Sequence, residues 1–144
     1  MLTIRRQHLA EILEHCRREA PLEACGILSG REGVVSRVYP MTNVEQSPYR
    51  YLMAPEEQFR VMGEVWSRGE ELVGIYHSHP ASEAYPSPRD VDMAYYPECF
   101  YVIVSLVGEP VVKAFRIAGG RILATDICFE DREGAPERFV DPGV

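Results

Sequence analysis

The stretch "GIYHSHPASEAYPSPRD", residues 74–90, restricts the possible folds of this chain more than any other part of the sequence. An apolar run ends in two histidines one residue apart, His77 and His79, and a proline-rich loop leads to a Ser-Pro-x-Asp step. Alternate side chains of a strand project from the same face, so a strand would place both imidazoles together. Ser87 followed by proline, with Asp90 three residues on, is typical of a helix N-terminus. The sequence therefore predicts a strand, a loop and a capped helix, in that order.

The same residues have the chemistry of a metal site. Two imidazoles on one face supply half of a zinc site, and a catalytic zinc takes three protein ligands and leaves the fourth position for water. Asp90 is the nearest third candidate, because a capped helix places its carboxylate on the first turn, where it can point back to the strand end. Ser87 and Asp90 would also suffice as a helix cap without any metal, and the two interpretations are compatible. Ser and Asp at these spacings after His-x-His are expected by chance in only a few of about ten thousand sequences of this composition.

Composition and charge exclude several classes of protein. The 144 residues are 46% hydrophobic and 26% charged, as in an ordinary globular protein. A net charge of -7 argues against a nucleic-acid surface. The sequence has no apolar run of the roughly 18 to 20 residues that span a bilayer, and its N-terminus is too charged for a signal-peptide core. We therefore expect a cytoplasmic protein that binds neither nucleic acid nor membrane.

The four cysteines are expected to be buried free thiols. Cys16, Cys25, Cys99 and Cys128 are widely scattered and form no C-x-x-C pair. A core of this size in a reducing compartment needs no disulfide.

The pattern along the chain predicts one domain over residues 1–130 and a loose acidic tail over 131–144. A helix is expected from Thr3, as its cap, to about Ala20. A second helix should begin at Pro55 and bury a stripe formed by Phe59, Met62 and Trp66. Arg17 and Arg18 lie beside Glu14 and Glu19 at helical spacing and should be on a solvated face. His8 and His15 are interpreted as surface or packing residues.

Apolar and alternating runs between these helices predict the strands. They are "EACGILSG" and "VVSRVYPMTN" as a hairpin, "YRYLMA", "ELVGIYHSH" as a central strand, "CFYVIVSL", and a C-terminal hairpin of "PVVKAFRI" and "RILATDICF" across a Gly-Gly turn. The predicted fold class is α/β, with a curved, mixed β-sheet flanked by helices and the site at strand ends.

Other catalytic patterns fit the sequence less well. There is no H-E-x-x-H helix, and the base-deaminase pattern of H-x-E with P-C-x-x-C is absent. Cys25 could be a thiol nucleophile, but its apolar neighbours favour a buried, inert thiol. A structural zinc site would need a fourth protein ligand, for which Cys25 or Cys99 could approach in space.

The motif His77-Ser78-His79, seven residues, then Ser87-x-x-Asp90 resembles the JAMM motif of the MPN-domain metalloproteases, the family of proteasomal and signalosome deubiquitinating subunits. The upstream "PLEACGILSG" resembles the glutamate-bearing first strand of that family. The resemblance covers roughly residues 8–118, and the compact length is most like the bacterial and archaeal single-domain members. It implies an MPN/JAB domain of cytidine-deaminase-like fold.

The resemblance also implies a role for each motif residue. His77, His79 and Asp90 would be the ligands of one zinc ion per chain, Glu23 the general acid and base, and Ser87 a donor near the developing oxyanion. Such a base must come within hydrogen-bond reach of the attacking water without ligating the metal, which suits a neighbouring strand. A serine that caps a helix can serve an oxyanion only if the loop geometry allows both roles.

The family cleaves amide or isopeptide bonds after the C-terminal Gly-Gly of ubiquitin-like proteins, and its compact bacterial members resemble enzymes that process ubiquitin-fold sulfur carriers. The resemblance therefore implies a zinc metallopeptidase or isopeptidase that acts on a small ubiquitin-like or sulfur-carrier protein. A noncatalytic MPN-type binding or assembly module is the alternative. A scaffold has no physical need for the two histidines, Asp90 and Glu23 together, which favours the enzyme.

Overall fold

The computed structural model describes residues 1–132 and 135–138. This part of the chain forms three helices and nine strands. In chain order they are β1 (Leu2–Arg5), α1 (Arg6–Glu19), β2 (Cys25–Arg31), β3 (Val34–Met41), α2 (Pro55–Ser67), β4 (Glu71–His79), α3 (Pro88–Asp92), β5 (Phe100–Ser105), β6 (Val111–Ala118), β7 (Arg121–Thr125), β8 (Ile127–Arg132) and β9 (Ala135–Arg138).

The strands of the described residues form one mixed sheet, in the order β7-β6-β5-β4-β2-β3-β1-β8-β9. Strand β4 is central and pairs parallel with β5 and antiparallel with β2. Only Asp126 separates β7 from β8 in the chain, yet six strands lie between them in the sheet. A flat sheet would place these two strands about 30 Å apart, which one residue cannot span, so the sheet curls until they approach each other. The predicted curved, mixed sheet is confirmed.

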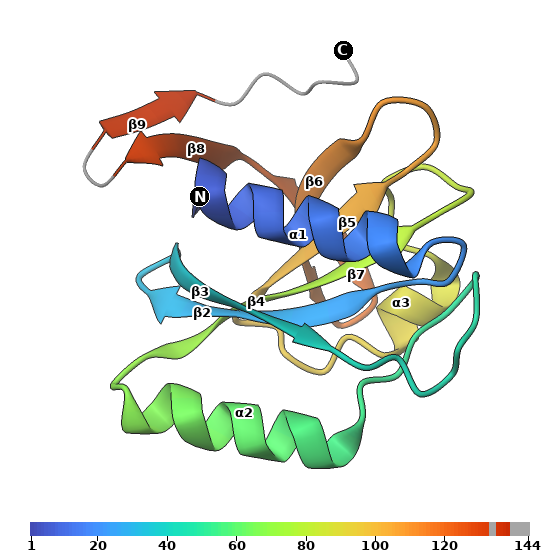
Figure 1. The fold of residues 1–144 in the computed structure, drawn as a ribbon, viewed down its shortest axis with the longest axis horizontal. Helices are drawn as coiled ribbons and strands as arrows, with labels where there is room; N and C mark the ends of the chain where they lie inside the picture. The colour runs from blue at the N-terminus through green and yellow to red at the C-terminus, as the bar shows by residue number, and fades with distance from the viewer. Residues whose placement is uncertain (133–134, 139–144) are drawn as a thin grey trace.

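Helices α1 and α2 cover opposite faces of this sheet (Figure 1). Ile12 and Cys16 of α1 belong to one core cluster, together with Tyr76 of β4. Val61 and Val65 of α2 belong to a second cluster on the other face. Because side chains alternate along β4, each face of this central strand is buried under a different helix.

The N-terminal segment differs from the prediction. Residues 2–5 form strand β1, which pairs parallel with β8, and α1 begins only at Arg6. The predicted Thr3 cap is therefore wrong, since Arg5 is the residue that precedes the helix and its side chain makes no capping bond. Leu2 and Ile4 are fully buried. Their burial and the strand pairing over-rode the helical spacing of the sequence.

The predicted orientation of α2 is also wrong. The helix begins at Pro55 as expected, but Phe59 and Trp66 are 84% and 68% exposed. Val61 and Val65 are the buried residues that face the sheet, and of the predicted stripe only Met62 packs partly against that core. The helix carries two apolar stripes, and its period does not say which one is buried.

Two other segments depart from the expected strands. "YRYLMA" makes only an isolated bridge, between Asn43 and Met53, and belongs to a loop. "RILATDICF" is divided at Asp126, so only its first half, β7, pairs with β6. Of the expected loose tail 131–144, residues 131–132 and 135–138 belong to β8 and β9, and 133–134 and 139–144 lie outside the described residues.

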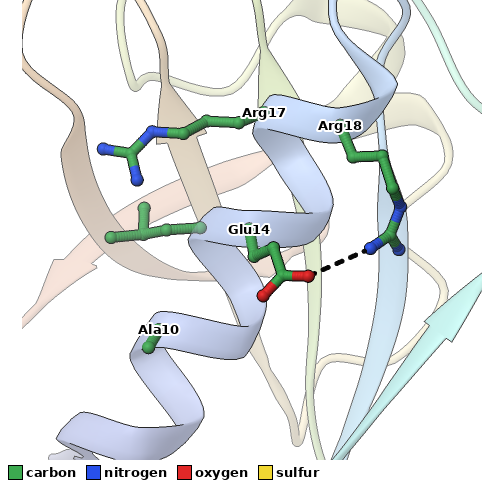
Figure 2. A pocket seen from close by; sticks show the side chains of 5 residues that line it. Ala10, Glu14, Arg17 and Arg18 are labelled. Atoms are coloured by element: carbon green, nitrogen blue, oxygen red, sulfur yellow. Dashed lines mark hydrogen bonds and ion pairs between the residues drawn. The ribbon is translucent and has the colours of Figure 1, made fainter.

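The outer face of α1 has the expected mixed charge. Ala10, Leu13, Glu14, Arg17 and Arg18 line a pocket there, and Arg18 pairs with Glu14 at 3.4 Å while both side chains stay exposed (Figure 2). An exposed pair four residues apart on a helix is typical of a solvated face. None of the described helices combines the length and the apolar character that a membrane span requires.

Candidate metal centre and active site

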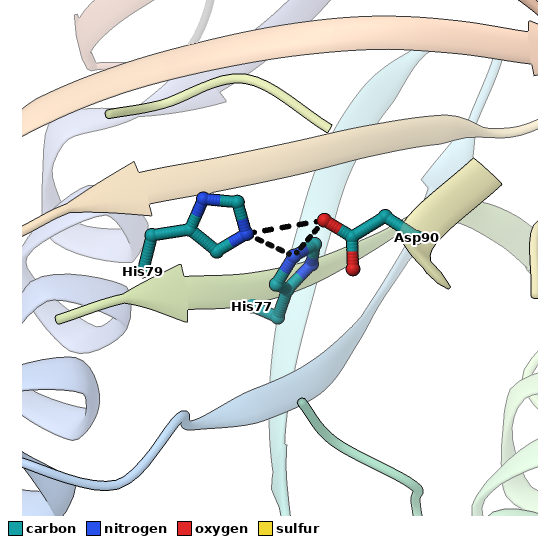
Figure 3. Close-up of side chains that lie close together, drawn as sticks. All are labelled: His77, His79 and Asp90. Atoms are coloured by element: carbon teal, nitrogen blue, oxygen red, sulfur yellow. Dashed lines mark hydrogen bonds and ion pairs between the residues drawn. The ribbon is translucent and has the colours of Figure 1, made fainter. Parts of the chain in front are cut away.

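Strand β4 delivers both histidines of the motif to one place. His77 and His79 are 1% and 3% exposed, and they project toward Asp90 from the same face of the strand (Figure 3). Strand β5 pairs with β4 through both histidines, and β2 pairs with its other side as far as His77, so the backbone that carries the two rings is held by strand pairing. The predicted convergence of the two imidazoles is therefore present in the structure.

Helix α3 supplies the third member of this group through its cap. Ser87 Oγ accepts a hydrogen bond from Asp90 N at 3.0 Å, and Ser87 N donates to Asp90 Oδ2 at 2.9 Å, which is a complete capping box. The cap turns the carboxylate toward the end of β4. Asp90 Oδ2 then lies 3.1 Å from Nε2 of His77 and 3.1 Å from Nε2 of His79, and the two Nε2 atoms are 3.1 Å apart.

The tautomer of His79 shows what such a triangle can hold. Its Nδ1 lies 2.8 Å from the backbone oxygen of Glu83, which can only accept, so Nδ1 carries the hydrogen. In the neutral ring Nε2 is then a bare lone pair that faces the Asp90 carboxylate. Two acceptors this close repel each other unless a cation or a proton lies between them. His77, His79 and Asp90 could therefore hold a metal ion.

The electrostatics of the three side chains suit that role. Burial lowers the pKa of His77, which favours the neutral ring that a metal requires. Burial alone would raise the pKa of Asp90, but hydrogen bonds with His77 and His79 hold it below its usual range. Burial alone would lower the pKa of His79, yet the hydrogen bonds with Asp90 and the Glu83 carbonyl raise it. The group thus offers an ionised carboxylate on Asp90 and a neutral imidazole on His77.

Glu23 lies near this group, just before β2, and is 3% exposed. Burial raises the pKa of its carboxyl to about 8, while nearby His79 opposes the rise and Asp90 adds to it. Its Oε1 atom is buried without a hydrogen-bond partner among the described residues. A buried carboxyl with a pKa near neutrality, close to a metal-binding group, is suited to move protons.

The cysteines do not take part in the group. All four are buried free thiols, as expected. Burial raises the pKa values of Cys25 and Cys99 to about 12, which makes a thiolate nucleophile unfavourable at neutral pH. Among the described residues, the cluster that could hold a metal contains no cysteine. A closed structural zinc site with a cysteine ligand is therefore not supported.

Residues that the sequence did not single out also contact the centre. The ring of Tyr51 stacks on His77, with ring centroids 4.7 Å apart. Asn43 binds the backbone oxygen of Glu23 at 3.0 Å. Both belong to the loop between β3 and α2, where polar and aromatic residues are common, so no spacing pattern marks them.

Comparison with known proteins places the chain in a family. Residues 5–118 match the family model described as prokaryotic homologues of the JAB domain. The chain belongs to this family, which confirms the predicted MPN/JAB class.

Named relatives and a solved structure agree with this assignment. The chain is 41% identical over 127 residues to the CysO-cysteine peptidase of Mycobacterium tuberculosis, covering 85% of this chain and 86% of that protein. It is 38% identical over 125 residues to the probable TtuB-protein conjugate cleaving protease of Thermus thermophilus, covering 86% and 81%. The crystal structure of AF2198, a JAB1/MPN domain protein from Archaeoglobus fulgidus, superimposes with a TM-score of 0.60 at 19% identity, covering 90% and 96%, and so shares the fold.

Proposed function

We propose that the chain is a zinc-dependent metallopeptidase or isopeptidase that hydrolyses the amide bond after the C-terminal Gly-Gly of a small ubiquitin-like or sulfur-carrier protein. The observation that carries the proposal is the triangle formed by Nε2 of His77, Nε2 of His79 and Oδ2 of Asp90, with sides of 3.1 Å. Ligand atoms bound at about 2.0 to 2.1 Å around a tetrahedral zinc lie roughly 3.3 Å apart, close to this spacing.

Two imidazoles and one carboxylate, with a fourth position left for water, are a donor set typical of catalytic zinc. One ion per chain is expected. When bound, zinc lowers the pKa of a coordinated water toward about 7, so that an attacking hydroxide is available at neutral pH. The Glu83 carbonyl, which fixes the tautomer of His79, is the kind of outer contact that orients a metal-binding histidine.

Glu23 is proposed to carry the proton. Its carboxylate accepts a proton from the attacking water and returns it to the nitrogen of the leaving amine as the C–N bond breaks. A pKa near 8, raised by burial, is close enough to neutrality for both transfers. The same burial excludes bulk water that would compete for the proton.

Ser87 is proposed to stabilise the oxygen of the scissile carbonyl as it becomes negative. Its Oγ accepts the cap bond from Asp90 N, and an accepted bond leaves the hydroxyl hydrogen free to donate. The cap and the donor role are therefore compatible in this geometry.

The substrate class is proposed from the relatives. One is named for CysO-cysteine and the other for TtuB-protein conjugates, and the chain covers more than four fifths of each. The requirement for Gly-Gly rests on the family resemblance. Four buried free thiols are consistent with the predicted cytoplasmic location, which stays a prediction.

The proposal is tested by measuring zinc per chain and the cleavage of Gly-Gly adducts in the wild type, Asp90→Ala and Asp92→Ala. Asp92 is a matched control, because it lies on the same helix and is exposed. We expect about one zinc per chain in the wild type and in Asp92→Ala, and a clear loss of zinc and cleavage in Asp90→Ala.

Each other outcome has a definite meaning. If the wild type binds no zinc even after supplementation, the proposal of a zinc metallopeptidase is wrong, and a noncatalytic binding module is favoured. A wild type that binds zinc but cleaves no Gly-Gly adduct would keep the metal site and reject the substrate class.

A further inference from the structure

The loop of residues 42–54 between β3 and α2, which we call the site loop, contacts Glu23, His77 and helix α3. The Ser47 carbonyl accepts a hydrogen bond from Glu23 N at 2.9 Å. Tyr51 covers the ring of His77. Glu45 pairs with Arg89 of α3, the helix that carries Asp90, at 3.3 Å. One loop therefore connects the segments that bear the base and the metal-binding group.

The side chain of Asn43 forms hydrogen bonds with several backbone groups in and beside this loop. Its side-chain Nδ2 donates to the backbone oxygens of Glu23 at 3.0 Å and Arg50 at 3.1 Å. Its Oδ1 accepts from the backbone N–H groups of Glu45 and Leu52, both at 3.0 Å. An amide side chain has two donor hydrogens and two acceptor lone pairs, so Asn43 uses its full capacity. With an exposure of only 9%, it has little water to replace any of these bonds.

These contacts fix the backbone of Glu23 from both sides. The site loop binds its N–H through Ser47 and its carbonyl oxygen through Asn43. The carboxyl end has no comparable support, because its Oε1 atom finds no hydrogen-bond partner among the described residues. The position of the carboxylate is thus set mainly by the backbone. A general base must be held within a fraction of an ångström of its working position, so what fixes this backbone affects the rate.

We propose that Asn43 is a positioning residue, whose carboxamide ties the site loop to the backbone of Glu23 and holds the base in place for proton transfer. This inference rests on the proposed function of Glu23. The four hydrogen bonds of Asn43 go to Glu23, Arg50, Glu45 and Leu52 and to none of the metal-binding group, so its proposed role is separate from metal binding.

The test compares Asn43→Ala and Asn43→Asp with the wild type and with Thr42→Val. Asn43→Asp keeps the two acceptor bonds inside the loop and loses both donor bonds, to the backbone oxygens of Glu23 and Arg50. Thr42 is the matched control, because it is the neighbouring loop residue and its hydroxyl binds Glu57 of α2 instead. We expect both Asn43 variants to retain about one zinc per chain while kcat falls about tenfold or more and KM changes less than about threefold. Thr42→Val should stay within about twofold of the wild type.

A double-mutant cycle separates positioning from general loosening of the fold. If Asn43 acts through Glu23, then Asn43→Ala should cause no further loss of cleavage in a Glu23→Gln background. If Asn43 instead has a general structural role, the loss of cleavage in the double variant should be the product of the losses in the two single variants. Equal losses in both backgrounds, or a loss of zinc in Asn43→Ala, would overturn the inference.

Hydrogen exchange tests the same inference without any substrate. The Glu23 amide should exchange about tenfold faster or more in zinc-loaded Asn43→Ala, while amides in the middle of β4 keep their wild-type rates. If the wild type cleaves no adduct, the proposed function fails, and the exchange rate still decides whether Asn43 fixes the Glu23 backbone. An unchanged Glu23 amide would reject the positioning role.

Discussion

The two faces of β4 both bury polar side chains and both involve histidine, yet they are built for different purposes. On the face toward α1, the Tyr76 hydroxyl forms a hydrogen bond of 2.7 Å with Nδ1 of His15, and Ser78 Oγ accepts a hydrogen bond of 2.8 Å from Ala24 N. Each contact on this face joins a donor to an acceptor. Such contacts are complete without a ligand.

On the opposite face the polar atoms do not match in this way. The Nε2 lone pair of His79 faces the carboxylate of Asp90, because Nδ1 is already committed to the Glu83 carbonyl. The difference teaches that burial and residue type alone do not mark a functional centre. A functional centre is marked by several hydrogen-bond acceptors that converge on one point without donors to match them.

The largest expected difference comes from replacing one histidine on each face. His77→Ala should lose the zinc ion and reduce cleavage by about a thousandfold or more, since it removes a metal ligand. His15→Ala should keep both, and should only lower the free energy of unfolding. Metal analysis, cleavage rates and urea denaturation of the two variants check this. Zinc loss in His15→Ala would break the distinction between the faces.

Glu23→Gln should distinguish the role of Glu23 in proton transfer from the role of the metal ligands on the same face of β4. The amide cannot accept the proton, so cleavage should fall by about 10²- to 10⁴-fold, while about one zinc per chain remains. Cleavage assays and metal analysis of the purified variant check the prediction. A variant that keeps more than about a tenth of wild-type activity would exclude Glu23 as the general base.

Gly26→Ala should disturb the packing only on the face of β4 that lies toward α1. A Cβ atom at this position would overlap the ring of Tyr76, which is fully buried and has no room to move. We expect the free energy of unfolding to fall by about 3 kcal/mol, measured by urea denaturation, because overpacking forces strain into the core. The folded fraction should still bind zinc. Gly63→Ala is the control, since a Cβ there would meet no atom outside the local backbone of its own helix within 4 Å.

Tyr76→Phe should have a smaller effect on the same face. It removes the hydroxyl that partners His15 and leaves the buried Nδ1 atom unpaired. A loss of about 1 to 2 kcal/mol in the free energy of unfolding is expected, with zinc content and cleavage rate unchanged. A measurable fall in zinc content would show that the two faces are coupled through β4.

The smallest expected effect is a pH dependence contributed by His15. Burial lowers its pKa below 6.5, with Arg18 adding to the fall and Glu19 opposing it. The unfolded chain therefore binds more protons as the pH drops below about 6.5, and acid reduces stability. His15→Asn should show a flatter curve of Tm against pH between pH 7 and 5 than the wild type. Parallel curves would mean that His15 makes no such contribution.

Much of the site could be predicted from the sequence because its signals are local. Strand alternation placed His77 and His79 on one face, and the capping box turned Asp90 toward them. Asn43 could not be found in this way, since the atoms that it binds include the Glu23 carbonyl, 20 positions away. The prediction of which face of α2 is buried failed for a similar reason. Which of its apolar stripes faces inward depends on the sheet, and the sheet is not readable from the helix.

The pairing of β1 with β8 has a consequence for how the chain folds during synthesis. Strand β1 lies between β3 and β8, and its four paired residues on β8 are about 125 positions further along the chain. During synthesis, the first strand therefore waits with one edge unpaired until β8 has emerged from the ribosome. The closure of this sheet joins strands far apart in the chain, so it carries a large loop-entropy cost, and the free edge of β1 is open to wrong partners until β8 pairs with it.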